Sequence, residues 1–238
     1  MLLPGLIVCA AFFGESLFGF GGGLVSIPLI SISLGVRDAI VFVLFFQFLM
    51  GVLLIWSYKN IEWRFAVPMT IGLLLGTLIG TYMLGMLSEQ FLLYILAGSI
   101  LVFLIKMIFF SGLTFGTHTE QRWGFIAGLI GGWFQGIIGI GGPILTMYLT
   151  VATESKAAFR ATLIYLLFLT SAARLALSFQ QGLISEKVVG LALPVIPIFL
   201  AVIIAGQFIH KKIDDTYYRS AVYLILFISA ITLLSRAF

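Results

Sequence analysis

Four polar residues stand out because each lies within an apolar stretch of the sequence: Glu15, Gln47, Gln135 and Arg174. A carboxyl group in an apolar setting can carry a coupled proton, and the two amides can donate hydrogen bonds to ligand oxygens. Arg174 has a fixed charge on a planar guanidinium, which binds an anion through two parallel hydrogen bonds. Each also has a simpler explanation. In these simpler explanations, Glu15 would lie near the membrane interface, the two amides would only bridge helices, and Arg174 would extend to the lipid headgroups.

Two glycine clusters could bind an anion through the backbone. Gly19-Phe20-Gly21-Gly22-Gly23 follows Glu15, and Gly139-Ile140-Gly141-Gly142-Pro143 follows Gln135. Such sequences break a helix, and the helix that starts after a break presents free N–H groups and a positive dipole end. The alternative is that the glycines only allow close helix packing, as we expect for single glycines such as Gly72. The candidate contacts with an anion are Gly21, Gly22, Gly23, Gly141 and Gly142, with Ser26 as a minor candidate.

The composition places these residues in a membrane protein. Hydrophobic residues make up 61% of the 238 residues and charged residues only 9%, whereas a soluble domain has about 25% charged residues. A chain of this size cannot bury so much apolar surface within itself, so the excess must face lipid. Alternating apolar runs of about ten residues, which indicate barrel strands, are missing. The sequence therefore predicts an all-α integral membrane protein.

We predict eight hydrophobic helical segments. Five of them lack Asp, Glu, Lys and Arg and reach the roughly 20 residues that a membrane-crossing helix needs; they are Ser16–Val36, Ala39–Tyr58, Phe65–Ser88, Trp123–Thr153 and Val188–His210. Three more lie at about 90–110, 158–180 and 216–236. With their full apolar stretches, the first segment runs from Leu2 to Leu34 and the fifth from about Trp123 to Val151. Both contain a glycine cluster and are too long for simple spans, so we expect both to be broken or re-entrant. Broken backbone at membrane depth is tolerated where it is buried in protein or lines a cavity.

The eight segments form two repeats of four, residues 1–112 and 113–238, within one membrane domain. The glycine clusters align at a spacing of 120 residues, which also pairs Glu15 with Gln135. A second register, at 126 residues, pairs Pro68 with Pro194, and Ser88-Glu89 with Asp214-Asp215. The last pair has the form of a helix N-cap followed by an acid. The order of these matches along both halves indicates an internal repeat.

The positions of Lys and Arg favour inverted repeats. If segments 1 and 5 each crossed the membrane once, six basic loop residues would lie on each side. If both segments enter and leave on the same side, nine lie on one side and three on the other, as the positive-inside rule requires. The nine inside would be Lys59, Arg64, Lys106, Arg122, Lys156, Arg160, Lys211, Lys212 and Arg219, and the three outside Arg37, Lys187 and Arg236.

The glycine motifs also resemble those of a known family. Phe18-Gly19-Phe20-Gly21-Gly22-Gly23, followed by Pro28, resembles the first-half motif of the sulfite exporter TauE/SafE family, and Gly136-Ile137-Ile138-Gly139-Ile140-Gly141-Gly142-Pro143 resembles its second-half counterpart. The resemblance implies a multi-pass permease for sulfur-containing anions such as sulfite or organosulfonates, commonly an exporter. It also implies that Thr162 occupies the family's small-hydroxyl position early in the sixth segment. The first-half equivalent, Ala39-Ile40-Val41-Phe42, lacks a hydroxyl.

Together these observations predict a secondary transporter rather than an enzyme, with alternating access around a midplane site formed by the two broken helices. An anion channel with a glycine-rich re-entrant filter is the alternative. No cofactor or metal is expected, because Cys9 is the only cysteine and His118 and His210 lie far apart. The expected location is the plasma (inner) membrane, crossed several times. The expected partners are a small anionic substrate and the lipid bilayer, without nucleic acid, and a homodimer is left open.

Overall fold

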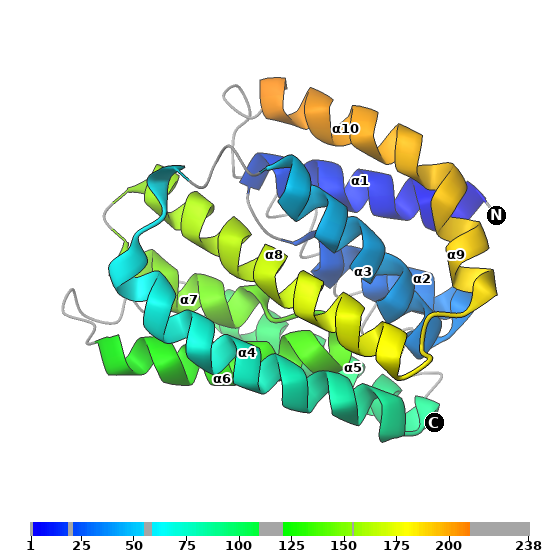
Figure 1. Cartoon of the computed structure of the whole chain (residues 1–238), viewed down its shortest axis with the longest axis horizontal. Helices are drawn as coiled ribbons and strands as arrows, with labels where there is room; N and C mark the ends of the chain where they lie inside the picture. The colour runs from blue at the N-terminus through cyan, green and yellow to red at the C-terminus, as the bar shows by residue number, and fades with distance from the viewer. Residues whose placement is uncertain (1, 19–20, 55–58, 110–120, 154, 210–238) are drawn as a thin grey trace. The chain divides into compact units, whose positions relative to one another are not determined.

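The structure is a computed structural model that describes residues 2–18, 21–54, 59–109, 121–153 and 155–209. Within these ranges the regular elements are all helices, as the sequence predicts (Figure 1). They are α1 (Leu2–Phe18), α2 (Gly22–Leu34), α3 (Val36–Leu53), α4 (Trp63–Met86), α5 (Glu89–Phe109), α6 (Gln121–Ile138), α7 (Gly142–Ala152), α8 (Lys156–Gln180), α9 (Glu186–Ala192), the 3-10 turn η2 (Leu193–Val195) and α10 (Ile196–Ile209). The predicted eighth segment, about 216–236, lies outside the described residues.

Several helical stretches have the length and composition of membrane spans. Among the described residues, four are long and apolar enough to cross a bilayer: Val36–Leu53, Trp63–Met86, Ala157–Gln180 and Glu186–Gly206. Shorter apolar helices include the two on either side of each predicted break, α1 with α2 and α6 with α7. The chain is therefore a multi-pass membrane protein.

Both predicted breaks are present. The first segment is divided into α1 and α2, and the fifth into α6 and α7. Gly21 has a φ of 113° and Gly139 a φ of 74°. Residues with a Cβ rarely adopt these angles, so glycine is what allows the chain to leave one helix and begin the next.

The seventh predicted segment is present as one candidate span, Glu186–Gly206, with a short irregularity inside it. It consists of α9, η2 and α10, with Pro194 inside the 3-10 turn. Proline lacks the N–H that would continue the α-helical ladder and clashes with the preceding turn. Ser185 caps α9 by accepting from the Val188 N–H, so this segment begins at Glu186, two residues earlier than expected.

The helices pack as two compact units, and each draws on both halves of the sequence. Unit 1 comprises Met1–Phe46, Leu87–Gly112 and Ile184–Phe238, and unit 2 comprises Gln47–Met86 and Leu113–Leu183. The division falls within α3, whose last turns from Gln47 onward belong to unit 2. The repeat boundary between residues 112 and 113 stays a prediction.

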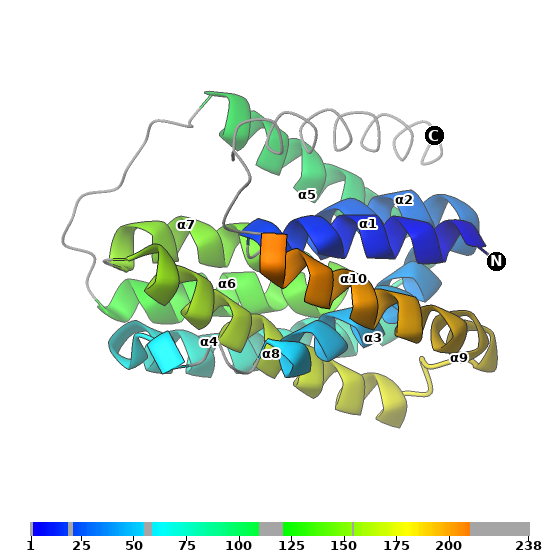
Figure 2. The same ribbon diagram turned by 90° about the horizontal axis from the view of Figure 1, so that it is seen from above.

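In unit 1, α1 and α10 lie side by side (Figures 1 and 2). Phe199 of α10 packs against Phe12 and Phe46, with ring centroids 5.4 Å and 4.9 Å apart. A Cβ atom on Gly206 would overlap Ser16 Oγ, so this contact has no room for a larger residue. These aromatic and close contacts hold the first helix against α10.

A single carboxylate organises the start of α3 and of α5 in unit 1. Ser88 accepts from the Phe91 N–H and Glu89 lies in the first turn of α5, which confirms the predicted cap. Glu89 also accepts hydrogen bonds from the backbone N–H groups of Val36 and Arg37 at the start of α3. A negative charge at a helix N-terminus is stabilising because it complements the helix dipole. The repeat mate, Asp214-Asp215, lies outside the described residues.

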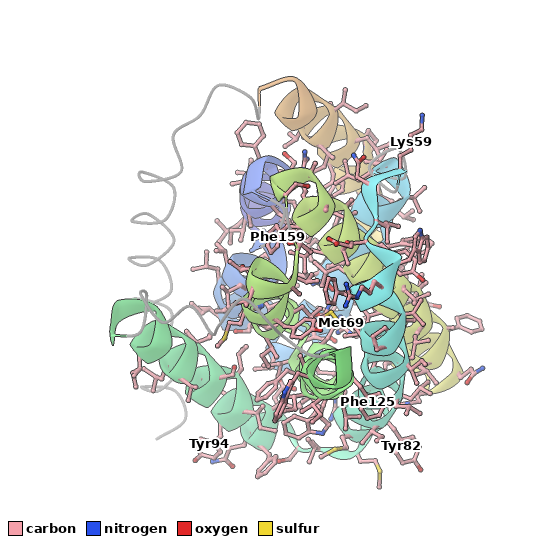
Figure 3. The ribbon with its side chains drawn as sticks, turned by 90° about the vertical axis from the view of Figure 1, so that its left-hand side faces the viewer. Lys59, Met69, Tyr82, Tyr94, Phe125 and Phe159 are labelled. Carbon is pink, nitrogen blue, oxygen red and sulfur yellow. The ribbon has the colours of Figure 1, made fainter. Side chains whose placement is uncertain are left out.

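In unit 2, α4 and α6 meet through their backbones. A Cβ atom on Gly72, Gly76 or Gly80 of α4 would overlap a backbone carbonyl oxygen of α6. The reverse holds for Gly128 and Gly132 of α6, where a Cβ would overlap carbonyl oxygens of α4. Figure 3 shows Met69 of α4 and Phe125 of α6 beside this contact. The expected packing role of the single glycines in α4 is therefore confirmed.

Helix α8 runs parallel to α4, so contacts between the two helices show which residues of α8 lie beside which residues of α4. Near the N-termini of both helices, the Glu62 N–H donates to Thr162 Oγ1 at 3.1 Å, and the centroids of the Trp63 and Tyr165 rings lie 5.3 Å apart. Near the C-termini of both helices, a Cβ atom on Gly85 would overlap Gln181 Oε1. Both helices run in the same direction in Figure 1.

Candidate functional site

The break between α6 and α7 is held by a side chain from the turn before it. Gln135 Oε1 accepts a 2.6 Å hydrogen bond from the Gly141 N–H, and both residues are buried. A Cβ atom on Gly141 would lie 2.7 Å from Gln135 Cβ and would overlap the Gly131 carbonyl oxygen. The break is therefore a closely packed structure in which glycine is required for space.

Gln47 and Arg174 join this break from two other helices of unit 2. Arg174 Nη1 on α8 donates to Gln47 Oε1 on α3 at 3.0 Å. Gln47 Nε2 in turn donates to the Gly139 carbonyl oxygen at 3.1 Å, and Gln135 Nε2 lies 3.5 Å from Gln47 Oε1. The structure thus brings together three of the predicted site residues and the second glycine break.

The guanidinium of Arg174 retains binding capacity. Its side chain is 0% exposed, so it does not extend to the headgroups as the simpler explanation requires. Within the part of the chain that the structure describes, Nε and Nη2 have no hydrogen-bond partner. These two atoms form one edge of the guanidinium, the edge that binds two oxygens of a carboxylate, phosphate or similar anion. An unpaired buried charge is costly, so this edge is suited to an anionic ligand.

The break between α1 and α2, in unit 1, is held in a similar way. Glu15 Oε2 accepts a 2.6 Å hydrogen bond from the Gly22 N–H, and Ser26 Oγ donates back to the Gly22 carbonyl oxygen. A Cβ atom on Gly22 would overlap the Glu15 carboxylate and lie 2.9 Å from the Phe12 ring. Glu15, Gly22, Gly23 and Ser26 are all buried. Glu15 is therefore enclosed by protein, and its carboxylate occupies the N-terminus of α2.

Metal ligands do not gather in the described part of the chain. No group of three or more His, Cys, Asp or Glu side chains that could hold a metal ion is found among the described residues. His118 and His210 lie outside them. The expectation that the protein needs no cofactor stays a prediction.

Comparison with known proteins identifies the family. The model of the sulfite exporter TauE/SafE family matches residues 4–233. The chain belongs to this family. The resemblance inferred from the two glycine motifs is confirmed.

One curated TauE/SafE relative gives a more specific comparison. The probable sulfite/organosulfonate exporter TauE of Cupriavidus necator is 26% identical over 157 residues. The match covers 63% of this chain and 59% of the relative, so it spans about three fifths of the relative's length. No solved structure matches the chain.

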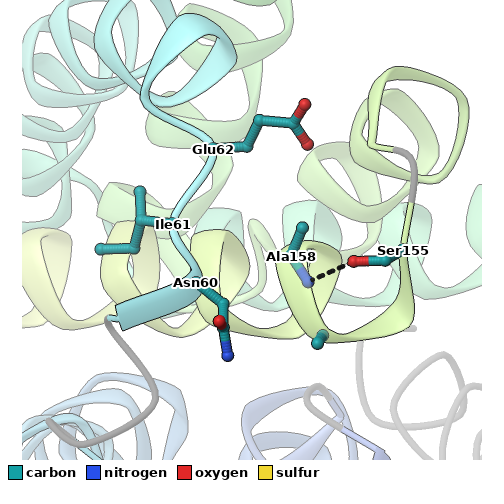
Figure 4. A pocket seen from close by; sticks show the side chains of 6 residues that line it. Asn60, Ile61, Glu62, Ser155 and Ala158 are labelled. Carbon is teal, nitrogen blue, oxygen red and sulfur yellow. Dashed lines mark hydrogen bonds between the residues drawn. The ribbon is translucent and has the colours of Figure 1, made fainter.

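Thr162, which the TauE/SafE resemblance assigns to a small-hydroxyl position, lies away from Arg174. The two residues are twelve positions apart on α8, or about 18 Å along the helix axis. Thr162 is buried and accepts the hydrogen bond from Glu62, which lines a pocket of about 330 Å³. Figure 4 shows this pocket between the chain preceding α4 and the start of α8, with Ser155 capping Ala158.

Two buried hydroxyl groups were not identified from the sequence as candidate site residues. They are Thr81 on α4, which is 0% exposed, and Ser178 on α8, which is 1% exposed. Ser178 follows Arg174 by four residues and so lies on the same face of α8. That spacing was a usable signal, whereas Thr81 could be linked to them only through the packing of α4 against α8.

Proposed function

We propose that the protein is a secondary transporter for small sulfur-containing anions such as sulfite or an organosulfonate. Family membership and the name of the Cupriavidus relative support this substrate class. The observation that carries the proposal is the fully buried Arg174, whose Nε and Nη2 atoms have no partner among the described residues. A tetrahedral sulfonate or pyramidal sulfite has two oxygens at a spacing that this edge can bind.

The surrounding residues support an anion site with fixed geometry. Gln47 accepts from Nη1 and donates to Gly139, which orients the guanidinium and leaves its other edge available. We propose that the backbone at the second break, where the Gly141 N–H donates to Gln135, lines the site without adding a charge. Because protein rather than water surrounds the charge, its attraction for an anion is stronger than at an exposed surface. We assign the substrate to this break in unit 2.

Glu15 is the proposed carrier of a coupled proton. It is a buried carboxyl group in contact with the N-terminus of α2, through Gly22. Intramembrane carboxyl groups of this kind commonly serve ion coupling in transporters. No Walker-type Gly-Lys-Ser/Thr occurs in the sequence, so a gradient of protons or of the substrate itself is the proposed source of energy.

The proposed mechanism is alternating access, with the two repeats in inverted orientation and segments 1 and 5 re-entrant. Two similarly capped helix breaks, and the nine-to-three distribution of Lys and Arg, support this arrangement. The proposed location is the plasma membrane. The midplane site formed by both breaks, with Gly21, Gly22 and Gly23 also contacting the substrate, stays a prediction from the sequence, and the proposed anion site uses the second break alone.

The experiment that tests the function combines binding with transport. Sulfite, methanesulfonate, sulfate and chloride are added to the purified protein in detergent, and the melting temperature is measured for each. A ligand that binds only the folded state raises that temperature, so we expect stabilisation by sulfite and methanesulfonate beyond that by chloride. In proteoliposomes, uptake should saturate and show counterflow. Equal stabilisation by every anion, or unitary conductance steps, would contradict the proposal and favour a channel.

A further inference from the structure

The described part of unit 2 includes two buried hydroxyl groups, on α4 and α8, that lack a hydrogen-bond partner, as part of the Arg174 guanidinium does. Among the described residues, Thr81 Oγ1 and Ser178 Oγ form no hydrogen bond, although both side chains are buried. Most buried polar groups in proteins are hydrogen-bonded, and leaving one unsatisfied destabilises the folded protein. Together with Nε and Nη2 of Arg174, four unsatisfied atoms belong to three residues of two packed helices.

The register of α4 and α8 brings these residues to neighbouring levels. The contacts of Glu62 with Thr162 at one end, and of Gly85 with Gln181 at the other, pair the two helices along their length. By this register, Thr81 lies level with Ser178. Arg174 lies one turn earlier, about 6 Å along the axis. Arg174, Thr81 and Ser178 thus lie within about one helical turn of each other along two packed helices, and we refer to these three residues as the polar track.

The track leads toward a polar end of unit 2. Gln180 and Gly182, where α8 terminates, are exposed. From Arg174 to Gln181 the distance along the axis is about 10 Å. The starts of α4 and α8 are on the side that we assign to the cytoplasm, because Arg64 and Arg160 lie there. The track consequently runs from Arg174 toward the external side, which is the direction of export.

We propose that Arg174, Ser178 and Thr81 line a hydrated passage through which the anion leaves its site at the α7 break for the external side. The proposal rests on the proposed function, because the cargo is the anion bound by Arg174. Water satisfies the two hydroxyls when the passage is empty, and the anion's oxygens accept from them as it passes. Hydroxyls suit this task because they bind an anion more weakly than a guanidinium does, so the anion is not retained.

Cysteine accessibility tests whether the passage is hydrated. Thr81→Cys and Ser178→Cys are made separately in a Cys9→Ser background and exposed on intact cells to an anionic, membrane-impermeant methanethiosulfonate. Leu73→Cys on α4 and Leu166→Cys on α8 are matched controls, because both leucines are fully buried and apolar. We expect labelling of positions 81 and 178 from outside, with neither control labelled. Failure of both to label, in protein that binds methanesulfonate normally, would overturn the passage.

A blocking substitution gives an independent measurement. Ser178→Leu fills the track with apolar volume, whereas Ser178→Ala removes only the hydroxyl. We expect Ser178→Leu to lower the maximal transport rate by at least about tenfold, because an apolar constriction dewets. Its affinity for methanesulfonate in detergent should change by less than about threefold. Wild-type transport by Ser178→Leu would overturn the passage.

The two proposals fail separately. Labelling at Thr81→Cys and Ser178→Cys without any Arg174-dependent anion binding would support a hydrated passage and contradict the proposed substrate. Normal anion binding with unlabelled cysteines and full transport in Ser178→Leu would contradict the passage alone.

Discussion

Glu15 and Gln135 make similar contacts at the two helix breaks. Each places a side-chain oxygen 2.6 Å from the backbone nitrogen of a nearby glycine, which is the first residue of α2 (Gly22) in one case and the N-cap of α7 (Gly141) in the other. The geometry is shared but the charge is not. The N-terminus of α2 has its own carboxylate, whereas the amide at α7 leaves the charge of Arg174 available for a ligand. This difference is the reason for assigning the anion to the second break.

Replacing Glu15 by glutamine tests its role in coupling. Glu15→Gln retains an oxygen that accepts from the Gly22 N–H, so we expect the protein to fold and to insert. It removes the group that can gain and lose a proton. Anion counterflow in proteoliposomes should therefore persist, while accumulation driven by a proton gradient should be lost. Proton-driven accumulation at the wild-type level would assign the coupling to another group.

The reverse exchange at the second break has the opposite purpose. Gln135→Glu introduces a carboxylate beside Gln47 and Arg174, where it competes with the substrate for the guanidinium. We expect the affinity for methanesulfonate to fall by at least about tenfold, which corresponds to about 1.4 kcal/mol. Calorimetry on the purified variant measures it, with Gln135→Leu as the neutral control. Unchanged affinity would place the anion away from this break.

Arg174 itself is tested by removing and then restoring its charge. Arg174→Gln keeps hydrogen-bonding groups but no charge, and charge-assisted hydrogen bonds contribute about 1.5–3 kcal/mol each. We expect the dissociation constant for methanesulfonate to rise by about ten- to a hundredfold. Arg174→Lys should recover only part of this, because an ammonium is a point charge that lacks the paired geometry. Wild-type affinity in Arg174→Gln would show that the buried guanidinium is structural.

The glycine requirement at the second break can be measured against a matched alanine substitution. Gly141→Ala places a Cβ 2.7 Å from that of Gln135, and over-packing of this kind costs about 1–3 kcal/mol. Gly98→Ala in α5 meets no atom within 4 Å. A helical alanine there should instead stabilise by about 0.5–1 kcal/mol. Thermal unfolding in detergent should show shifts of opposite sign, and a Gly141→Ala variant as stable as wild type would refute the packing argument.

The orientation of the repeats has a direct topological test. On a Cys9→Ser background, Lys59→Cys and Lys211→Cys should react with an impermeant thiol reagent from the cytoplasmic side, and Lys187→Cys from outside. Lys59 is exposed and directed away from the helices (Figure 3). Lys187 is also exposed, and its 3.0 Å ion pair with Asp38 is a surface pair whose loss costs little. Reaction of positions 187 and 211 from one side would refute inversion.

The sequence predicted the parts of this structure that depend on local chemistry. Consecutive glycines locate the two breaks, and Arg174 is noticeable because it lies in an otherwise apolar stretch. The contact between Gln47 and Arg174 could not be predicted, because 127 residues separate them and no local pattern records which helices meet. The unsatisfied Thr81 and the position of Thr162 beside Glu62 likewise depend on the register of α4 against α8. The 3-10 turn at Pro194 was missed because apolar composition continues through it.

The backbone contact between α4 and α6 has a practical consequence. Side chains between most helix pairs can change rotamer and so absorb movement, but here carbonyl oxygens of each helix occupy the space left by glycines of the other. Few side chains at this contact can rearrange, so α4 and α6 should move together as one rigid body throughout a transport cycle. Spin labels on the exposed Tyr82 of α4 and Ile126 of α6 would consequently provide an internal ruler of constant length. Movements elsewhere in the protein can be measured against it.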